Sequence, residues 1–469
     1  MTHFILNRQA IDDHADPATV VLDLIRQRPS LTGTKDVCRE GDCGACQVLL
    51  GKMRGGRLRY QAVNACLLPL GAIDACHVVT VEGLNAEFLN PIQRALVDCG
   101  AIQCGFCTPG LVMALTGFFL NAETSNEQAA IDAIAGNLCR CTGYAGIKRA
   151  IARLCRQFDL SGSPPGRRID DLVQWQILPA YFSDIAAKLS AIAPRSPIEP
   201  SPDAILVGGG TDLWVGRPHS LHTQSLAFLP GSAEGVRFDA DDCIIDAATT
   251  IEQLQTSTLF RQWFPSITQD FELICSAPVR ARATVGGNLV NASPIADLAV
   301  FFLALNARLL LVSHNASRTV SLKDFFQGYK QVDLQSGERL QAIRFNRTAA
   351  QGFSYEKVGM RRHLDIAAVN SALGIEHDDG RIVNARLSAG GVAPVPFYFE
   401  KTSAYLQGRP ITPATVTAAA DIARQEIAPI SDLRGSADYK RLLLRQLIFA
   451  HFMKLFPEAI RWEPLHARQ

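Results

Sequence analysis

Two cysteine-rich segments stand out in the sequence, Gln103-Cys104-Gly-Phe-Cys107-Thr108-Pro-Gly110 and, further along, Gly136-Asn-Leu-Cys139-Arg-Cys141-Thr142-Gly-Tyr144. Each segment holds two cysteines followed by threonine, and threonine before proline at the first helical position is a helix-start signal. We therefore expect Thr108 and Thr142 to open two neighbouring helices with four thiolates at their amino ends. The positive helix ends there favour negative charge, as an anionic iron–sulfur cluster requires. A tetrahedral zinc site and plain structural cysteines are the alternatives.

A second set of four cysteines lies upstream with a different spacing; it comprises Cys38, Cys43, Cys46 and Cys66. The pattern Cys-x4-Cys-x2-Cys with a distant fourth cysteine is that of plant-type [2Fe–2S] ligation. Small residues at Gly41, Gly44 and Ala45 permit a loop to wrap a cluster closely while its thiolates point inward. The pattern favours a cluster over zinc binding or a purely structural role.

Composition limits the class of protein. A length of 469 residues predicts two to four domains. With 46 basic and 45 acidic residues the protein has almost no net charge to attract nucleic acid or an anionic membrane. The sequence shows neither a signal peptide nor an apolar run of about 18 residues, so we expect a cytoplasmic protein without a membrane span. The 13 cysteines should then be thiols or metal ligands, and 11 of them lie before residue 156.

Local patterns predict the first elements. Residues 3–7 read as a strand, 18–27 as a helix, and Gly55-Gly56 as a hairpin turn. Asn90-Pro91 should start a helix, and Ser125-x-x-Gln128 should be the capping box of another. These helices and the two opened by Thr108 and Thr142 predict an all-helical second domain of four helices.

Beyond a linker at 161–174, rich in serine, proline and glycine, the chemistry should change because cysteine becomes rare. An apolar strand at 205–207 runs into Gly208-Gly-Gly-Thr-Asp212, which fails both the Rossmann and the P-loop patterns. A second glycine stretch spans 283–297. Two amide-rich loops could hold both ends of a long phosphate-bearing cofactor.

The remainder, from about Gly352, alternates as strands around a hairpin turn at Asp378-Asp-Gly380, followed by helices after Thr412 and Ser436. The basic run of Lys440, Arg441 and Arg445 is typical of a solvated helix face rather than of a nucleic-acid patch.

The cysteine stretches together resemble the two-cluster module of the xanthine dehydrogenase/aldehyde oxidase family of molybdenum hydroxylases. The matching motifs are Glu40-Gly-Asp-Cys-Gly-Ala-Cys46, Asn64-Ala-Cys66, Gln103-Cys-Gly-Phe-Cys-Thr-Pro-Gly110 and Gly136-Asn-Leu-Cys-Arg-Cys-Thr-Gly143. The resemblance implies one [2Fe–2S] cluster on each four-cysteine set. It also implies that Gln103 touches the molybdopterin of a partner and that Cys141 lies close to it. Val37 departs from the family, which usually has glycine before the first ligand. The sequence therefore leaves open whether the backbone at this position has a positive φ.

The glycine stretches resemble the FAD domain of the same family, whose fold is that of vanillyl-alcohol oxidase. The resemblance implies a pyrophosphate loop made of Leu206, Val207, Gly208, Gly209, Gly210, Thr211, Asp212 and Leu213. Further FAD contacts would be Ile274, Thr284, Asn288, Asn291, Asp297, Leu340 and Lys357. Ile274 departs from the family, because some animal members have phenylalanine there.

The fold class we expect is therefore a multidomain α+β protein. It comprises a β-grasp ferredoxin domain at 1–86, a four-helix [2Fe–2S] domain at 87–160, the linker at 161–174, an FAD-binding domain at 175–348 and an α+β C-terminal flavoprotein domain at 349–469.

The resemblance implies a small subunit, with no residue that catalyses hydroxylation, since the chain ends at Gln469 without room for a molybdenum-binding region. The leading hypothesis is the small subunit of xanthine dehydrogenase in purine catabolism. It would pass electrons from a large molybdopterin subunit through two [2Fe–2S] clusters to FAD and then NAD⁺, in a heterotetramer of two small and two large subunits. The alternatives are the same role for an aldehyde or an N-heterocycle, and a stand-alone electron-transfer module.

The exit to NAD⁺ is expected between Lys357 and Asp365, a segment that matches the family's loop beside the flavin. Arg361 and Arg362 could pair with cofactor phosphates there through planar, charge-assisted hydrogen bonds. His363 and Leu364 replace acidic residues found in animal members.

Overall fold

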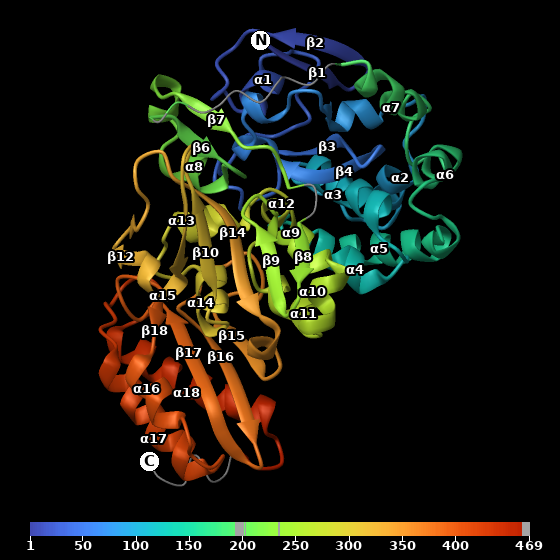
Figure 1. Ribbon diagram of the computed structural model, residues 1–469. Helices are drawn as coiled ribbons and strands as arrows, with labels where there is room; N and C mark the ends of the chain where they lie inside the picture. The colour runs from blue at the N-terminus through green and yellow to red at the C-terminus, as the bar shows by residue number, and fades with distance from the viewer. Residues whose placement is uncertain (193–200, 202, 233–234, 462–469) are drawn as a thin grey trace. The chain divides into compact units, whose positions relative to one another are not determined.

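The computed structural model describes residues 1–192, 201, 203–232 and 235–461. The chain divides into two compact units, and Figure 1 labels most of their helices and strands. The first contains Met1–Ala233 and Ser276–Ala283, and the second contains Glu234–Cys275 and Thr284–Gln469.

The first unit begins with a five-stranded mixed sheet in the order β2-β1-β5-β3-β4. Its elements are β1 (Thr2–Leu6), β2 (Gln9–Asp13), α1 (Val21–Arg26), β3 (Gln47–Arg54), β4 (Arg57–Asn64), η1 (Ala65–Leu67), η2 (Leu70–Ala72), β5 (His77–Val79) and η3 (Val81–Leu84). The central β1 and β5 are parallel and the other pairs antiparallel, which is the predicted β-grasp arrangement. The β3–β4 turn uses Gly55 and Gly56 at φ 52° and 74°, as predicted.

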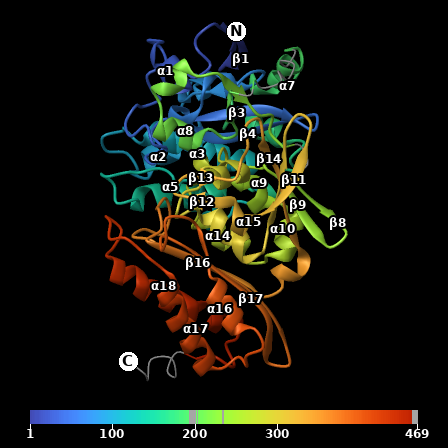
Figure 2. The ribbon, with the colours of Figure 1, turned by 60° about the vertical axis from the view of Figure 1, so that its left-hand side comes forward.

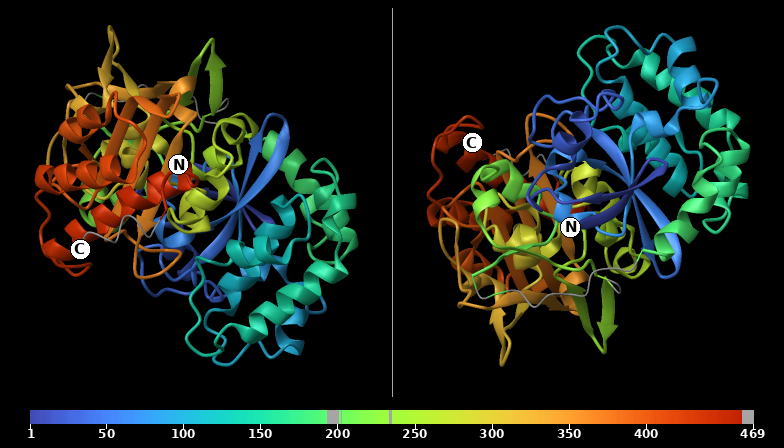
Figure 3. Two further views of the ribbon diagram at one scale, coloured as in Figure 1. Left: turned by 90° about the horizontal axis from the view of Figure 1, so that it is seen from below. Right: turned by 90° about the horizontal axis from the view of Figure 1, so that it is seen from above.

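Helices follow the sheet and pack against it, as the blue strands and the teal to green helices of Figure 3 show. They are α2 (Pro91–Asp98), α3 (Thr108–Asn121), α4 (Glu127–Ala133), α5 (Ala145–Gln157), η4 (Leu160–Gly162), α6 (Arg168–Gln174) and α7 (Phe182–Ser190). Asn90 and Gln93 form a capping box that starts α2 where predicted. Gly117 lets α3 approach β4 closely, since a Cβ there would lie 3.1 Å from the Cβ of Ala62.

The predicted capping box at Ser125 is wrong. Helix α4 is capped by Asn126, whose side chain accepts from the N–H of Ala129 at 2.9 Å. The hydroxyl of Ser125 donates instead to the carbonyl of Phe158 and accepts from the N–H of Leu160 at 3.0 Å. A long-range partner has therefore replaced the local bond that the pattern predicts.

The predicted helix start at Thr142 is also wrong. Helix α5 begins at Ala145, after Tyr144 at φ 64°. The Thr142 hydroxyl lies 3.2 Å from the Cys139 sulfur and accepts from the Tyr144 N–H, so it serves the cysteine loop. Thr108 does lie in the first turn of α3, but Cys107 occupies the cap position.

The stretch 161–174, expected as a linker, contains the last residues of η4 and all of α6. The buried guanidinium of Arg168 donates to the carbonyls of Phe119 (3.0 Å) and Ala122 (2.6 Å) at the end of α3. A cation there satisfies carbonyls that the helix leaves unpaired. Proline and glycine composition could not reveal this long-range contact.

The first unit also holds β6 (Ile205–Val207), α8 (Thr211–Gly216), η5 (Ser220–Thr223), β7 (Leu226–Phe228) and α12 (Ala277–Arg280). Strands β6 and β7 are parallel, and buried Val207 and Trp214 join the core of the β-grasp sheet. The Trp214 indole donates to the carbonyl of Ala18 at 2.9 Å. The strand predicted at 205–207 is present, packed with the first unit.

The second unit contains an antiparallel sheet in the order β11-β10-β14-β9-β8. Its elements are β8 (Val236–Asp239), β9 (Asp242–Asp246), α9 (Ile251–Thr256), α10 (Thr258–Trp263), α11 (Ile267–Glu272), α13 (Val285–Val290), α14 (Asp297–Ala304), β10 (Arg308–Val312), β11 (Ser317–Ser321), α15 (Leu322–Phe325), β12 (Phe326–Gly328), β13 (Gln331–Val332), β14 (Arg339–Asn346) and η6 (Arg347–Ala350). After Asp297, helix α14 is apolar on all sides and buried, because it packs on β16 and β17 as well.

The C-terminal part of the second unit is an antiparallel sheet in the order β15-β16-β17-β18. Its elements are β15 (Phe353–Val358), β16 (Val369–Asp378), β17 (Arg381–Gly390), β18 (Phe397–Tyr398), α16 (Glu400–Leu406), α17 (Pro413–Glu426) and α18 (Ala437–Leu455). The three helices pack together beside β16 and β17 (Figure 2). Asp379 and Gly380 form the predicted turn, and Thr412 and Ser436 cap helices as predicted.

The predicted solvated face of α18 is wrong at Lys440 and Arg445, which are both buried. Lys440 donates to the carbonyl of Ile430 at 3.0 Å and pairs with Asp432 at 2.7 Å, so it holds the turn before α18. Arg445 lies over the ring of Phe449. Burial of the aliphatic stems explains why a basic run can face a core.

His77 predicts an acid-dependent weakening of the first unit. Its Nε2 donates to the carbonyl of Asn7 (2.7 Å), so its Nδ1 accepts from the Tyr60 hydroxyl (2.6 Å). Burial lowers the pKa of His77 to about 4, so between pH 7 and pH 5 only the unfolded chain gains its proton. We expect the free energy of unfolding to fall by about 2 kcal/mol over this range from His77 alone. Urea unfolding of His77→Gln should lack this loss.

The exposed His219→Gln should keep the wild-type pH dependence and is the matched control. Equal pH dependence in wild type and His77→Gln would contradict the assignment of a neutral buried imidazole.

Candidate functional site: two cysteine sets and two amide-rich loops

The first cysteine set lies on the loop before β3 and on η1, and its sulfurs form two pairs. The sulfurs of Cys38 and Cys43 lie 3.3 Å apart, and the thiols of Cys46 and Cys66 also share a hydrogen bond. The hydrogen bond with Cys43 lowers the pKa of Cys38 to about 4, while that of Cys43 rises. One thiolate in each pair is therefore already favoured.

The second set also forms two pairs, at the surface of the helical part. The sulfurs of Cys104 and Cys141, both exposed, lie 3.5 Å apart, and Cys107 shares a hydrogen bond with Cys139. Burial raises the pKa of Cys139, but hydrogen bonds from Thr142 and neighbouring N–H groups outweigh it and lower the pKa to about 7.

The donor chemistry of both sets fits a [2Fe–2S] cluster. Such a cluster takes four thiolates, two on each iron, and both sets present their sulfurs two by two. Backbone N–H groups aim at the sulfurs, as at Cys38 from Glu40 and at Cys104 from Phe106. In the described part of the chain no three histidine, cysteine or acidic side chains gather as a single metal ion would need, whereas the paired thiols supply two ligands to each iron of a cluster.

The two cysteine loops touch each other inside the first unit. The N–H of Leu138, the residue before Cys139, donates to the carbonyl of Cys43 at 3.0 Å. The backbone contact requires Gly44 at φ 68°, since a Cβ there would lie 2.2 Å from the Gly136 carbonyl oxygen. One hydrogen bond thus links the backbone of Cys43, a residue of the first set, to the residue next to Cys139 of the second set.

Val37, the departure from the family pattern, causes no backbone strain. The positive φ values in this loop fall on Arg39 (57°), Gly41 (80°) and Gly44 (68°) and not on Val37. The guanidinium of Arg39 is held by Asp23 and Asp36, both at 2.6 Å, which stabilises the left-handed turn. The loop therefore makes its sharp bend two residues after the position at which the family has glycine.

The glycine loop after β6 is closed on one side by backbone. A Cβ at Gly209 would lie 2.0 Å from the Arg282 carbonyl oxygen, and Gly210 has φ 77°. The Arg282 guanidinium donates to the Gly209 carbonyl at 2.7 Å, while its buried Nε has no hydrogen-bond partner among the described residues. An orphaned donor of a cation beside a glycine loop fits an anionic group such as a diphosphate.

The second glycine stretch lies in the second unit and starts α13. Thr284 caps this helix by accepting from the Gly287 N–H at 3.1 Å, and Gly286 packs against Ala247. The buried side-chain oxygen of Asn288 lacks a partner in the described structure, so it can accept from a ligand hydroxyl.

Asp297, at the start of α14, joins three elements. One carboxylate oxygen accepts from the Tyr355 hydroxyl (2.7 Å) and the Asn370 amide (2.6 Å), and the other pairs with Lys357 at 2.9 Å. Lys357 also donates to the carbonyl of Leu273 at 2.8 Å. Burial raises the pKa of Tyr355 well above its usual value, so this hydroxyl remains a donor.

The other predicted residues are placed as follows. Gln103 is exposed next to Cys104, and Ile274 is fully buried in the second unit. Leu340 lies in β14, and the Asn291 side chain accepts from Lys330 at 2.7 Å. The prediction missed Arg282, Tyr355 and Asn370, because no motif marks them and each acts through a partner distant in sequence.

The two arginines of the 357–365 segment behave differently. The Arg361 guanidinium donates to the Leu364 carbonyl at 2.7 Å, and its N–H to Asp365 at 2.9 Å, so it closes its own loop. Arg362 is largely exposed and lies 3.8 Å from Glu272. Of the two, Arg362 is therefore the one available to a ligand.

Three family models match successive parts of the chain. They are a [2Fe-2S] binding domain at 80–152, an FAD binding domain in molybdopterin dehydrogenase at 176–346 and a CO dehydrogenase flavoprotein C-terminal domain at 354–455. A solved carbon monoxide dehydrogenase from Hydrogenophaga pseudoflava, which lacks the Mo-pyranopterin moiety of its molybdenum cofactor, is 30% identical with a TM-score of 0.50. The match covers 53% of this chain and 88% of that one. The chain belongs to the molybdenum hydroxylase family.

Other members agree with this assignment. Quinoline 2-oxidoreductase from Pseudomonas putida 86 is 26% identical with a TM-score of 0.51, over 56% of this chain and 92% of that one. Xanthine dehydrogenase of Drosophila subobscura is 28% identical over 97% of this chain. The match covers 39% of the fly protein, so the chain spans about two fifths of the length of such curated relatives.

The fold class and the cofactor predictions, [2Fe–2S] and FAD, are thereby confirmed. None of the helices in the described ranges has the length and apolar character needed to cross a bilayer.

The ligand assignment predicts the outcome of cysteine substitutions. Cys43→Ser and Cys104→Ser should each remove one of two clusters and halve the bound iron, because a hydroxyl poorly replaces a soft thiolate. Colorimetric iron analysis of the purified chain measures this. Cys99→Ser, outside both sets, should keep full iron content, and unchanged iron in either ligand variant would refute that set.

Proposed function

We propose that this chain is the electron-transfer small subunit of a xanthine dehydrogenase of purine catabolism. Its partner would be a large molybdopterin subunit that oxidises the substrate, in a cytoplasmic complex of two small and two large subunits. When bound, the clusters carry electrons singly and FAD collects two for NAD⁺. The observation that carries the proposal is the order of the parts along one chain, with two thiolate sets followed by an FAD-binding domain.

The eight cysteines would hold the clusters, and the second set is the one that faces outward. Cys104 and Cys141 are exposed, and Gln103 is exposed beside them. Phe106 and Leu138, which are 45% and 39% exposed, directly adjoin cysteine ligands of this set. Exposed apolar side chains around an exposed redox ligand suit the docking of a partner protein that delivers electrons.

The FAD site would use the residues implied by the resemblance. Gly208, Gly209 and Gly210 would let the diphosphate approach the backbone, with Arg282 supplying positive charge. In the second unit, the unpaired oxygen of Asn288 would accept from the cofactor, and Asp297 would hold Lys357 in one orientation. Thr284 and Asn291 shape the two ends of α13, and Leu340 would pack on the ring system.

A second candidate is the same subunit role in the oxidation of an N-heterocycle. The similarity to quinoline 2-oxidoreductase, which covers 92% of that chain, favours it. Substrate contacts of such enzymes would lie on the partner, so substrate identity follows from the complex and not from this chain.

Purification of the complex from its host tests the proposal. The full chain should copurify with molybdenum, and xanthine should bleach its flavin under anaerobic conditions, whereas bleaching by an N-heterocycle alone would select the second candidate. Phe106→Glu should lose the molybdenum protein, because a buried charge opposes docking. Val383→Glu, an exposed apolar site on β17, is the control. A chain with iron and FAD but no molybdenum would contradict both.

NAD⁺ specificity can be tested at Arg362. In the complex, Arg362→Ala should raise KM for NAD⁺ about tenfold while flavin reduction by substrate keeps its rate, because the lost contact lies downstream of the flavin. Steady-state NADH formation and stopped-flow flavin reduction measure the two steps. Arg424→Ala, an exposed arginine of α17, is the control, and slowed flavin reduction with an unchanged KM would refute the assignment.

A further inference from the structure

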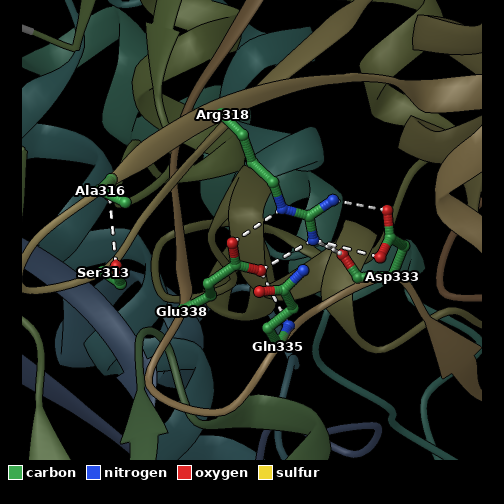
Figure 4. A network of polar contacts seen from close by, with 6 residues as sticks. All are labelled: Ser313, Ala316, Arg318, Asp333, Gln335 and Glu338. Atoms are coloured by element: carbon green, nitrogen blue, oxygen red, sulfur yellow. Dashed lines mark hydrogen bonds and ion pairs between the residues drawn. The ribbon is translucent and has the colours of Figure 1, made fainter.

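Arg318 of β11 holds two carboxylates and one backbone carbonyl (Figure 4). Its Nε and Nη2 donate to the two oxygens of Glu338 at 2.7 and 2.8 Å. Its Nη1 and Nη2 donate to the carboxylate of Asp333 at 2.8 and 3.1 Å, and Nη2 also reaches the Asp333 carbonyl at 2.9 Å. Every nitrogen of the guanidinium is therefore used within one loop.

The positive charge of Arg318 keeps the carboxylates of Glu338 and Asp333 ionised. One cation serves two carboxylates, and its hydrogen bonds hold the pKa of Glu338 at about 2 and the pKa of Asp333 below its usual value. The network therefore stays ionised throughout the physiological pH range. A bidentate pair also fixes direction, which a single ammonium cannot do.

The network closes the turn that leads into β14. Glu338 accepts from the Gln335 N–H at 2.8 Å, and the Glu338 N–H donates to the Gln335 carbonyl at 3.0 Å. Between them, Gly337 takes φ 75°. The side chain of Arg318 thereby holds Glu338, which lies directly before the start of β14 and two residues before Leu340.

Leu340 also lies at an irregularity of the sheet. The pairing of β10 with β14 shifts between Leu310 and Leu311, so that Leu311 faces Leu340 while Leu310 faces Ala342. Bulges of this kind redirect a side chain, and their geometry depends on what holds the flanking residues. The loop closed by Arg318 is the flanking segment on the β14 side.

The other end of the same loop leads to the α13 region. Strand β13 pairs with β12 through a turn whose Lys330 has φ 58°, a strained value for a residue other than glycine. Lys330 donates to Asn291 at 2.7 Å, the residue that follows α13. The Asp333–Glu338 loop thus lies between Asn291 and Leu340, two of the residues in the proposed FAD site.

We propose that Arg318 is a positioning residue for FAD, which acts by fixing the Asp333–Glu338 loop and through it Leu340 and the Lys330–Asn291 contact. The inference rests on the proposed FAD site. Arg318 touches no cofactor atom in this scheme. It keeps both ends of the loop in the geometry that binds FAD, so the loop loses little conformational entropy when the cofactor binds.

The experiment measures the dissociation constant of FAD by fluorescence quenching, with full-length chain stripped of FAD. Arg318→Ala should raise the Kd for FAD about tenfold. Arg318→Lys should recover only part of the wild-type affinity, because an ammonium group cannot pair with both carboxylates. Glu338→Gln keeps the shape and should raise Kd as well, and it covers the case in which Arg318→Ala does not fold. The visible circular dichroism of bound flavin should change in the same order, since it reports ring surroundings.

Arg308→Ala is the matched control, an arginine on neighbouring β10 that pairs with Asp242 at 3.2 Å, and should leave Kd unchanged. Asn288→Ala tests the FAD site itself and should weaken FAD binding directly. If Asn288→Ala weakens binding while Arg318→Ala and Glu338→Gln stay within twofold of wild type, the inference is overturned and the FAD site stands. If neither Asn288→Ala nor Arg318→Ala changes Kd, the proposed site fails together with the inference. Equal weakening of FAD binding in Arg308→Ala and Arg318→Ala would also overturn the inference about Arg318.

Discussion

The first unit depends on the backbone contact between its two cysteine loops. A Cβ at Gly44 would lie 2.2 Å from the Gly136 carbonyl oxygen, and a Cβ at Gly110 would lie 2.1 Å from the Gly44 carbonyl oxygen. Two positions without side chains, Gly44 and Gly110, therefore let a sheet loop and the helical part approach closely. The hydrogen bond from Leu138 to Cys43 follows from this approach. Electron transfer falls steeply with distance, so the close packing that joins the domains also shortens the route between the two ligand sets.

In the second unit a partly buried carboxylate plays the corresponding role. Asp297 receives hydrogen bonds from β15 and β16 and an ion pair from Lys357, so it ties α14 to the C-terminal sheet. Such a network is stable only when all its members are present, because an unpaired charge in this setting is costly. Glycine contacts permit approach in the first unit, whereas polar contacts fix direction in the second. The difference suits thiolate sets that need proximity and a flavin site that needs orientation.

The errors of sequence reasoning share one cause. Thr142 and Ser125 were assigned as helix caps because their types and spacing satisfy a local rule, but each has found a partner elsewhere, at Cys139 and Phe158. Lys440 reads as a surface residue by charge alone and is buried on Asp432. Patterns within one or two helical turns predicted well, as at Asn90, Thr412 and Ser436, because among the described residues those side chains bond within their own helices.

Residue spacing along the chain was enough to predict the α+β class, the β-grasp hairpin, the two four-cysteine sets and the glycine stretches, because that spacing carries the chemistry directly. How the cysteines pair, that the two loops touch, and that β6 and its glycine loop pack with the first unit became visible only in the folded chain. It also revealed Arg282, Tyr355, Asn370 and Arg318, which no motif marks. The physical reason is that hydrogen bonds and ion pairs between residues distant in sequence depend on the folded path of the chain, which local periodicity does not encode.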